Sequence, residues 1–185
     1  NAKIMELKAK FVEGDAEFLP YRENEFDIVL SQYGHMFAPR PSIVVKELAR
    51  VLKPGGILAF STWPKELFMG KFFKLIESFS QPLPPEVASP VLWGDMAVIE
   101  DRLRDHFDHI EFARDTMFAP TMSPAHMLKL FEKNAGPLAN LVKALADDPT
   151  KLSNLRNAAL VLIEKFFSNN FLRQDFLMTR CIKKT

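Results

Sequence analysis

The sequence has 185 residues, of which 48% are hydrophobic and 25% are charged, and its formal net charge is +1. This balance is typical of a globular domain with a sizeable core and argues against intrinsic disorder. The near-neutral charge predicts no nucleic-acid partner, and no apolar run approaches the ~20 residues of a membrane helix. Cys181 is the only cysteine. An internal disulfide framework and multi-cysteine metal sites are therefore excluded, and we expect a cytoplasmic protein.

The first third of the chain alternates between predicted helices and strands. Residues 1–10 resemble the tail of a helix, and because the chain begins at Asn1 rather than at methionine, we expect further residues upstream. Residues 10–13 are predicted to form a short strand. Residues 26–31 (FDIVLS) are an apolar run of strand length. Such a run is typical of a strand buried on both faces, as in parallel sheets.

The next helix is predicted to begin at Pro41, because proline is well tolerated in a first helical turn. Its buried stripe consists of apolar residues at helical spacing, namely Val44, Leu48, Val51 and Leu52. Residues 53–56 (KPGG) are predicted to end the helix, with glycine supplying a left-handed residue. Residues 57–62 form the next apolar strand. Two strands joined by one helix through short links require a crossover, so we expect them to be parallel.

The rest of the chain is predicted to add helices and two strands. In order, we expect a helix at 64–79, an irregular proline-rich link at 82–90, a helix at 94–107, a strand at 108–118, a helix from Ser123, a short helix at 138–145, a long helix capped by Thr150, and a strand at 176–182. The pattern predicts an α/β fold with a helical lid. The expected division is a partial cofactor-binding core at 1–63, a helical connection at 64–108, strands of the same sheet at 109–122 and 171–185, and the lid at 123–170.

Small molecules bind beyond the carboxyl ends of the strands in open parallel sheets. The ends predicted here are residues 14–16, 31–36 and 61–63. Asp15 could accept a hydrogen bond from an exocyclic amine while the Ala16 N–H donates to a ring nitrogen, which is a way to recognise adenine. The alternative is that Asp15 only closes a turn, and spacing alone favours that alternative.

His35 and several aromatic residues lie near the same strand ends. Imidazole titrates near neutral pH, so His35 is a candidate general base or substrate donor, although a lone histidine is more often a satisfied turn residue. The aromatic candidates for an apolar substrate pocket are Tyr33, Phe37, Trp63 and Trp93. Ordinary packing is the alternative interpretation, and it is preferred for Phe37. The histidines lack a carboxylate pattern, so no metal site is predicted.

The stretches GDAEFLPY, FDIVLSQYGHMF and ELARVLKPGGILAFSTW, in this order, resemble the class I S-adenosylmethionine-dependent methyltransferases. The likeness is to the methyltransferase type 11 branch, which includes ubiquinone/menaquinone methyltransferases. It implies a Rossmann-like sheet, S-adenosylmethionine as cofactor, and methyl transfer to a small, partly apolar acceptor. A small-molecule partner without nucleic acid or membrane insertion is implied, and a homodimer is left open.

The resemblance also implies roles for individual residues. Asp15 matches the adenine-binding acid of the family, and Ala16 matches its backbone partner. Ser31 and Gln32 correspond to residues near the methionine part of the cofactor. The segment from Tyr33 to Phe37, together with Trp63, corresponds to the rim that faces the substrate, and helices within 123–169 resemble the variable lid.

The sequence departs from the family at its beginning. The family sheet has the strand order 3-2-1-4-5-7-6, and its first strand carries a glycine-rich loop that wraps the cofactor. This sequence has no G-x-G spacing. Without the first two strands, a third strand at 11–13 would stand about 14 Å from the fourth, too far for hydrogen bonding. The alternative function is therefore a non-catalytic methyltransferase-like binding or assembly module.

Overall fold

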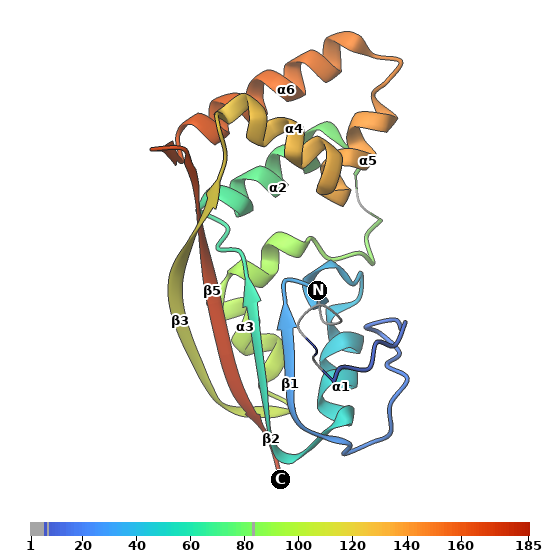
Figure 1. Cartoon of the computed structure of the whole chain (residues 1–185). Coiled ribbons are helices and arrows are strands. Elements are labelled where there is room, and N and C mark those ends of the chain that lie inside the picture. The colour runs from blue at the N-terminus through green and yellow to red at the C-terminus, as the bar shows by residue number, and fades with distance from the viewer. Residues whose placement is uncertain (1–5, 7, 83) are drawn as a thin grey trace.

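The computed structural model describes residues 6, 8–82 and 84–185, and its centre is one mixed β-sheet (Figure 1). The sheet has the order β1-β2-β5-β3, and the short β4 pairs with β5. The strand bounds are β1 Phe26–Gln32, β2 Leu52–Thr62, β3 Phe107–Pro120, β4 Phe167–Ser168 and β5 Phe171–Lys183. Strands β1 and β2 are parallel, whereas β5 runs antiparallel to both β2 and β3.

This strand order reproduces one half of the order implied by the resemblance. If β1 is the fourth strand of the family, then β1-β2-β5-β3 reads 4-5-7-6. The predicted α/β fold class is thus confirmed, and so are the predicted strands at 26–31, 57–62, 108–118 and 176–182.

Helix α1 (Pro41–Val51) makes the crossover between β1 and β2. It begins at proline, as predicted, and its buried face packs on the sheet. The register moves from the pair Phe26–Leu52 directly to the pair Ile28–Ile57, so the four residues 53–56 bulge out of the ladder. Gly55 has φ +75° there, a conformation that side chains rarely adopt. The predicted left-handed glycine is confirmed at Gly55, but the helix ends earlier than predicted, at Val51, and Leu52 and the KPGG segment belong to β2.

The remaining helices lie beyond the carboxyl ends of β1 and β2 or along the sheet (Figure 1). Their bounds are η1 His35–Phe37, α2 Phe68–Phe79, η2 Pro90–Gly94, α3 Met96–Leu103, α4 Pro124–Asn134, α5 Gly136–Ala144 and α6 Pro149–Glu164. Figure 1 shows α2, α4, α5 and α6 gathered at the end of the sheet to which β1 and β2 point. Among the residues described, no helix combines the length and the apolar character needed to cross a membrane.

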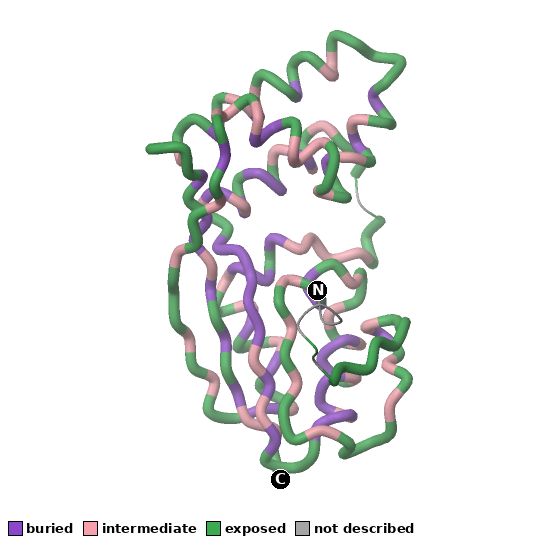
Figure 2. The backbone as a smooth tube through the Cα atoms, viewed as in Figure 1, coloured by how far each residue is buried: buried purple, intermediate pink, exposed green. Residues whose placement is uncertain are grey.

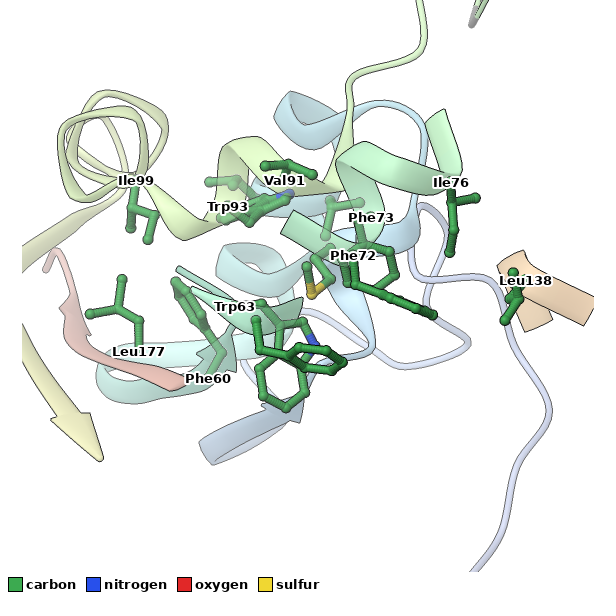
Figure 3. Close-up of a cluster of buried hydrophobic side chains, with 14 of the residues drawn as sticks. Phe60, Trp63, Phe72, Phe73, Ile76, Val91, Trp93, Ile99, Leu138 and Leu177 are labelled. Atoms are coloured by element: carbon green, nitrogen blue, oxygen red, sulfur yellow. The ribbon is translucent and has the colours of Figure 1, made fainter. Parts of the chain in front are cut away.

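One buried cluster joins the sheet to these helices (Figure 3). Phe60 and Trp63 come from β2 and its end, Trp93 comes from η2, and Phe72 comes from α2. The chain at Trp63 runs very close to a glycine, since a Cβ on Gly94 would lie 1.9 Å from the Trp63 carbonyl oxygen. The fold therefore needs glycine at that crossing.

Strand β1 contradicts the prediction of burial on both faces. Ile28 is 55% exposed and Leu30 is 74% exposed, whereas Leu58 on the neighbouring strand is fully buried. Figure 2 shows the same contrast between the two strands. Within the described part of the chain, β1 pairs only with β2, so one edge of β1 and the side chains of one face remain open.

Three further local predictions need correction. Residues 10–13 form no strand, and beyond them there is only an isolated bridge between Asp15 and Phe18. The helix predicted at 64–79 begins at Phe68, after a turn. The long helix is capped by Asp148, whose carboxylate accepts the Lys151 N–H, and not by Thr150. The helix tail predicted at 1–10 falls largely on residues outside the described part.

Candidate functional site

The carboxyl ends of β1 and β2 bring two predicted substrate residues into direct contact. The Tyr33 N–H donates to the Ser61 carbonyl at 3.2 Å, which extends the β1–β2 ladder by one residue. Tyr33 has φ +58°, an uncommon conformation for a residue other than glycine. Its ring stacks on Trp63, with ring centroids 3.9 Å apart and planes 3° from parallel. The strained backbone thus presents an aromatic pair at the strand ends.

His35 is the first residue of η1, two residues after Tyr33. It is almost completely buried, with 4% exposure. Its Nδ1 is 2.9 Å from Ser31 Oγ, and its backbone N–H donates to the same oxygen at 3.2 Å. The imidazole meets the rings of Phe60 and Trp93 edge-on, each at 4.5 Å. The structure therefore brings together three predicted site residues: Ser31, His35 and Trp93.

The electrostatics of His35 follow from this packing. Burial, together with a smaller contribution from the nearby positive charge of Arg102, lowers the pKa of His35 to about 3. The imidazole is therefore neutral at physiological pH. Its Nε2 is buried and has no hydrogen-bond partner among the residues described. Arg102 lies over the Trp93 ring at 4.5 Å, so the cation contacts the far side of the same aromatic cluster.

Asp15 and Ala16 lie in a turn of the loop formed by residues 14–25, which precedes β1. The Asp15 carboxylate accepts the Glu17 N–H at 2.9 Å, and the Asp15 carbonyl accepts the Phe18 N–H at 3.0 Å. Asp15 is exposed and Ala16 is half-buried. The geometry includes the turn-closing contact that spacing alone favoured, and it leaves the carboxylate accessible to a ligand.

Two ion pairs that sequence reasoning missed hold this loop against α1. Glu17 is buried, and its carboxylate accepts hydrogen bonds from the Arg40 backbone and guanidinium at 2.5–2.8 Å. The Arg40 hydrogen bonds hold the pKa of Glu17 below its usual range, although burial opposes this. Glu47 accepts the Leu19 N–H at 2.9 Å and pairs with Arg50 at 2.8 Å. Glu47 and Arg50 are three residues apart on α1, whereas the contacts of Glu17 with Arg40 and of Glu47 with Leu19 join distant segments, which no local sequence signal identifies.

A groove of about 390 Å³ runs between this loop and β1. Its lining includes three predicted site residues, Ala16, Ser31 and His35, together with Gly34. The other walls are mainly apolar side chains of β1, the loop and α1, namely Leu19, Tyr21, Phe26, Ile28, Val29, Leu30, Leu48 and Val51. Asp15 and Gln32 lie beside the groove in the chain but do not line it, and Gln32 is exposed.

Phe37 lies in a different cavity, of about 420 Å³, between η1, α2 and α5. Its ring is 46% exposed and meets Phe73 edge-on at 5.7 Å. Trp93 is fully buried, so it can shape the site only from behind His35. The predicted aromatic residues thus separate into an exposed ring at Phe37, a stacked pair at Tyr33 and Trp63, and a buried wall at Trp93.

Comparison with known proteins gives this site a family context. Residues 1–60 match a family model described as a methyltransferase domain. A solved S-adenosylmethionine-dependent methyltransferase from Thermotoga maritima superposes with a TM-score of 0.53 at 19% identity, covering 99% of this chain and 69% of that one. The fold is that of a class I methyltransferase. The resemblance seen in the sequence is thereby confirmed.

Two relatives define how far the similarity extends. An uncharacterized protein of Mycobacterium tuberculosis is 30% identical over 173 residues, which cover 93% of this chain. The chain spans 63% of that relative's length. The ubiquinone/menaquinone biosynthesis C-methyltransferase of Azotobacter vinelandii is 35% identical over 77 residues, 40% of this chain and 30% of that protein.

In the family order 3-2-1-4-5-7-6, β1 corresponds to the fourth strand. Its open edge is therefore the edge that pairs with the first strand in that order. The groove with Ala16, Ser31 and His35 lies along that edge. Across residues 6, 8–82 and 84–185, no three histidine, cysteine or acidic side chains are grouped so that they could hold a metal ion.

Proposed function

We propose that the protein transfers a methyl group from S-adenosylmethionine to a small, partly apolar acceptor. The observation that carries this proposal is the gathering of Ser31, His35 and the Tyr33–Trp63 stack where β1 and β2 end, in a sheet of methyltransferase order. These residues come from strands separated by a helix, and the fold unites them at the edge where α/β proteins bind small molecules.

The cofactor would lie in the groove along β1. Asp15 and the Ala16 N–H would hold the adenine edge, while Ser31 and Gln32 would face the methionine part. Support comes from the exposed Asp15 carboxylate and from Ala16 and Ser31 lining the same groove. When bound, S-adenosylmethionine supplies an electrophilic methyl group on a sulfonium. The described residues fit one wall of such a site.

The protein's own contribution would be positioning and exclusion of water. Tyr33 would face the acceptor with the buried Trp63 stacked behind it, and Phe37 would contact the acceptor from the neighbouring cavity. Trp93 would hold His35 in place. We also propose the division suggested by the sequence, in which residues 123–170 form a lid over the core at 1–63. The gathering of α4, α5 and α6 beyond the ends of β1 and β2 supports this role (Figure 1).

His35 is the proposed catalytic group for an oxygen acceptor. Its lowered pKa keeps the ring unprotonated at physiological pH, but it also makes the imidazole a weak base, because an efficient general base has a pKa near the operating pH. Nδ1 is engaged by Ser31, so Nε2 is the ring atom without a hydrogen-bond partner among the described residues. Because Nε2 is buried, an acceptor would reach it only after the side chains around His35 move. A carbon acceptor, of the kind named for the Azotobacter relative, would not depend on this base.

Binding of S-adenosylhomocysteine tests the proposal most directly. For the protein expressed from its complete gene, we expect calorimetric binding that Asp15→Ala weakens by about tenfold, the loss of one hydrogen bond to a charged group. Asp27→Ala, an exposed carboxylate paired with Lys53 on the far end of β1, is the matched control and should leave affinity unchanged. No binding at millimolar concentration would exclude the cofactor.

The alternative is a non-catalytic binding or assembly module. It is favoured by the lack of G-x-G spacing in the sequence and by the unpaired edge of β1 within the described chain. This alternative predicts no S-adenosylhomocysteine binding, together with self-association, such as a homodimer, that depends on Ile28 and Leu30. We expect a cytoplasmic location and a small-molecule partner under the main proposal.

A further inference from the structure

We propose that the cavity between η1, α2 and α5 is an acceptor site that selects an apolar molecule carrying an ammonium group. This inference rests on the proposed methyl transfer, since it names the class of acceptor. The cavity measures about 420 Å³. Its lining combines apolar side chains with a short polar rim: Phe37, Phe73, Ile76, Glu77, Ser80, Gln81, Pro82, Pro90 and Pro137.

The apolar wall would receive a ring or a short hydrocarbon. Phe73 and Ile76 are each only 7% exposed and belong to the buried core, so they form a firm floor. Phe37 stands edge-on to Phe73 at 5.7 Å and is partly exposed, so its free face is open to the cavity. Pro137 closes the far side from the lid helix α5. A ligand here would contact the core and the lid at the same time.

The charge of the cavity decides which polar group the ligand carries. Glu77 is the only ionisable side chain in the lining. Its Oε1 accepts the Ser89 hydroxyl at 2.5 Å, which orients the carboxylate, while Oε2 has no hydrogen-bond partner among the described residues. A half-buried carboxylate beside two aromatic rings favours a cation, since both the charge and the ring faces attract it. An anionic ligand would be repelled.

The position of the cavity connects it to the proposed reaction site. Phe37 is the last residue of η1, and His35 is the first. Phe37, which lines the cavity, is therefore two residues from His35, which lines the groove along β1, although the cavity and the groove share no lining residue. A molecule held by Glu77 at one end would place its apolar end against Phe37, the lining residue nearest to His35 in the chain.

The test uses three ligands of similar shape and different charge: 2-phenylethylamine, 2-phenylethanol and 3-phenylpropionate. Each is titrated into the intact protein, and its affinity is measured by ligand-observed NMR. We expect the amine to bind roughly fivefold more tightly than the alcohol, as for a partly exposed ion pair, and the acid to bind least. Glu77→Gln should remove the preference for the amine and leave the alcohol unchanged. The preference should also weaken in high salt.

Two further variants make the outcome decisive. Glu100→Gln changes an exposed glutamate on α3, outside this cavity, and should leave all three affinities unchanged. Phe37→Ala removes a partly exposed ring at small folding cost and should weaken all three ligands equally. Equal binding of the acid and the amine, or an amine preference that survives Glu77→Gln, overturns the inference, and so does the absence of binding by every ligand.

The same samples separate this inference from the proposed function. Binding of S-adenosylhomocysteine without an amine preference overturns only the acceptor assignment. An amine preference that depends on Glu77, in a protein that binds no S-adenosylhomocysteine, overturns the methyl-transfer proposal and leaves a ligand-binding cavity.

Discussion

Strands β1 and β2 have similar apolar sequences and very different surroundings. Strand β2 lies between β1 and β5, and Leu58 and Phe60 are buried in the core. Strand β1 pairs on one side only within the described chain, and Ile28 and Leu30 are mostly exposed. An apolar run therefore predicts that a strand forms, whereas the neighbouring strands and helices determine how much of it is buried.

The largest expected effect tests this contrast directly. Phe60→Ala should lower the free energy of unfolding by about 3–5 kcal/mol, because it opens a cavity in the core. Leu30→Ala should change it by less than about 0.5 kcal/mol, since most of that side chain is already in water. Urea denaturation of both variants measures the difference. A large loss for Leu30→Ala would mean that this face of β1 is covered in solution.

The second prediction concerns His35, which borders the groove along β1 and packs against the buried rings of Phe60 and Trp93. Its pKa is lowered from the ordinary value of 6.5 to about 3 in the folded protein. Between those values the unfolded state binds the extra proton, so stability is complete above pH 6.5 and falls as pH decreases. The expected slope from this residue is about 1.4 kcal/mol per pH unit.

Urea denaturation between pH 6.5 and pH 5 isolates the His35 contribution, because the paired carboxylates titrate at lower pH. His35→Gln should flatten the stability profile in this range. His106→Gln, which changes a histidine outside the buried cluster, is the matched control. An unchanged slope in His35→Gln would show that another group causes the pH dependence.

The third prediction concerns the loop that borders the open side of β1. Glu17→Gln should lower the free energy of unfolding, because the side chain keeps its size but loses the charge that the Arg40 guanidinium pairs with. Asp27→Asn breaks an exposed pair with Lys53 and should lower the free energy of unfolding by less than Glu17→Gln does. Hydrogen exchange of the Phe18 amide, which closes the turn, should accelerate in Glu17→Gln alone. Equal effects of the two variants would contradict the anchoring role.

The smallest change in stability is expected for Leu30→Cys, a variant that allows an exposed thiol on β1 to be compared with the buried thiol of Cys181 by chemical labelling. Burial raises the pKa of the Cys181 thiol to about 12, so the native protein should react very slowly with a thiol reagent at pH 8. Leu30→Cys places a second thiol on the exposed face of β1 with little change in stability. That thiol should react at the rate of a free cysteine. Slow labelling at residue 30 would show that the edge is protected.

The sequence alone predicted most of the local elements and the resemblance to class I methyltransferases. Apolar runs marked the strands at 26–31 and 57–62, Pro41 marked the start of α1, and the KPGG segment marked the left-handed residue Gly55, because these signals act through the backbone of neighbouring residues. The order of the elements also predicted the α/β class. The motif resemblance predicted the strand order, which no local pattern contains.

The tertiary structure decided the contacts between distant segments. It showed that Tyr33, rather than the adjacent Gly34, takes the left-handed conformation and stacks on Trp63. It also buried Glu17 against Arg40 and placed Phe37 in a cavity apart from the other candidates. Charge pairing and burial depend on which segments meet in space. That is why the sequence identified the candidate residues, while only the fold distinguished exposed Asp15 from buried His35.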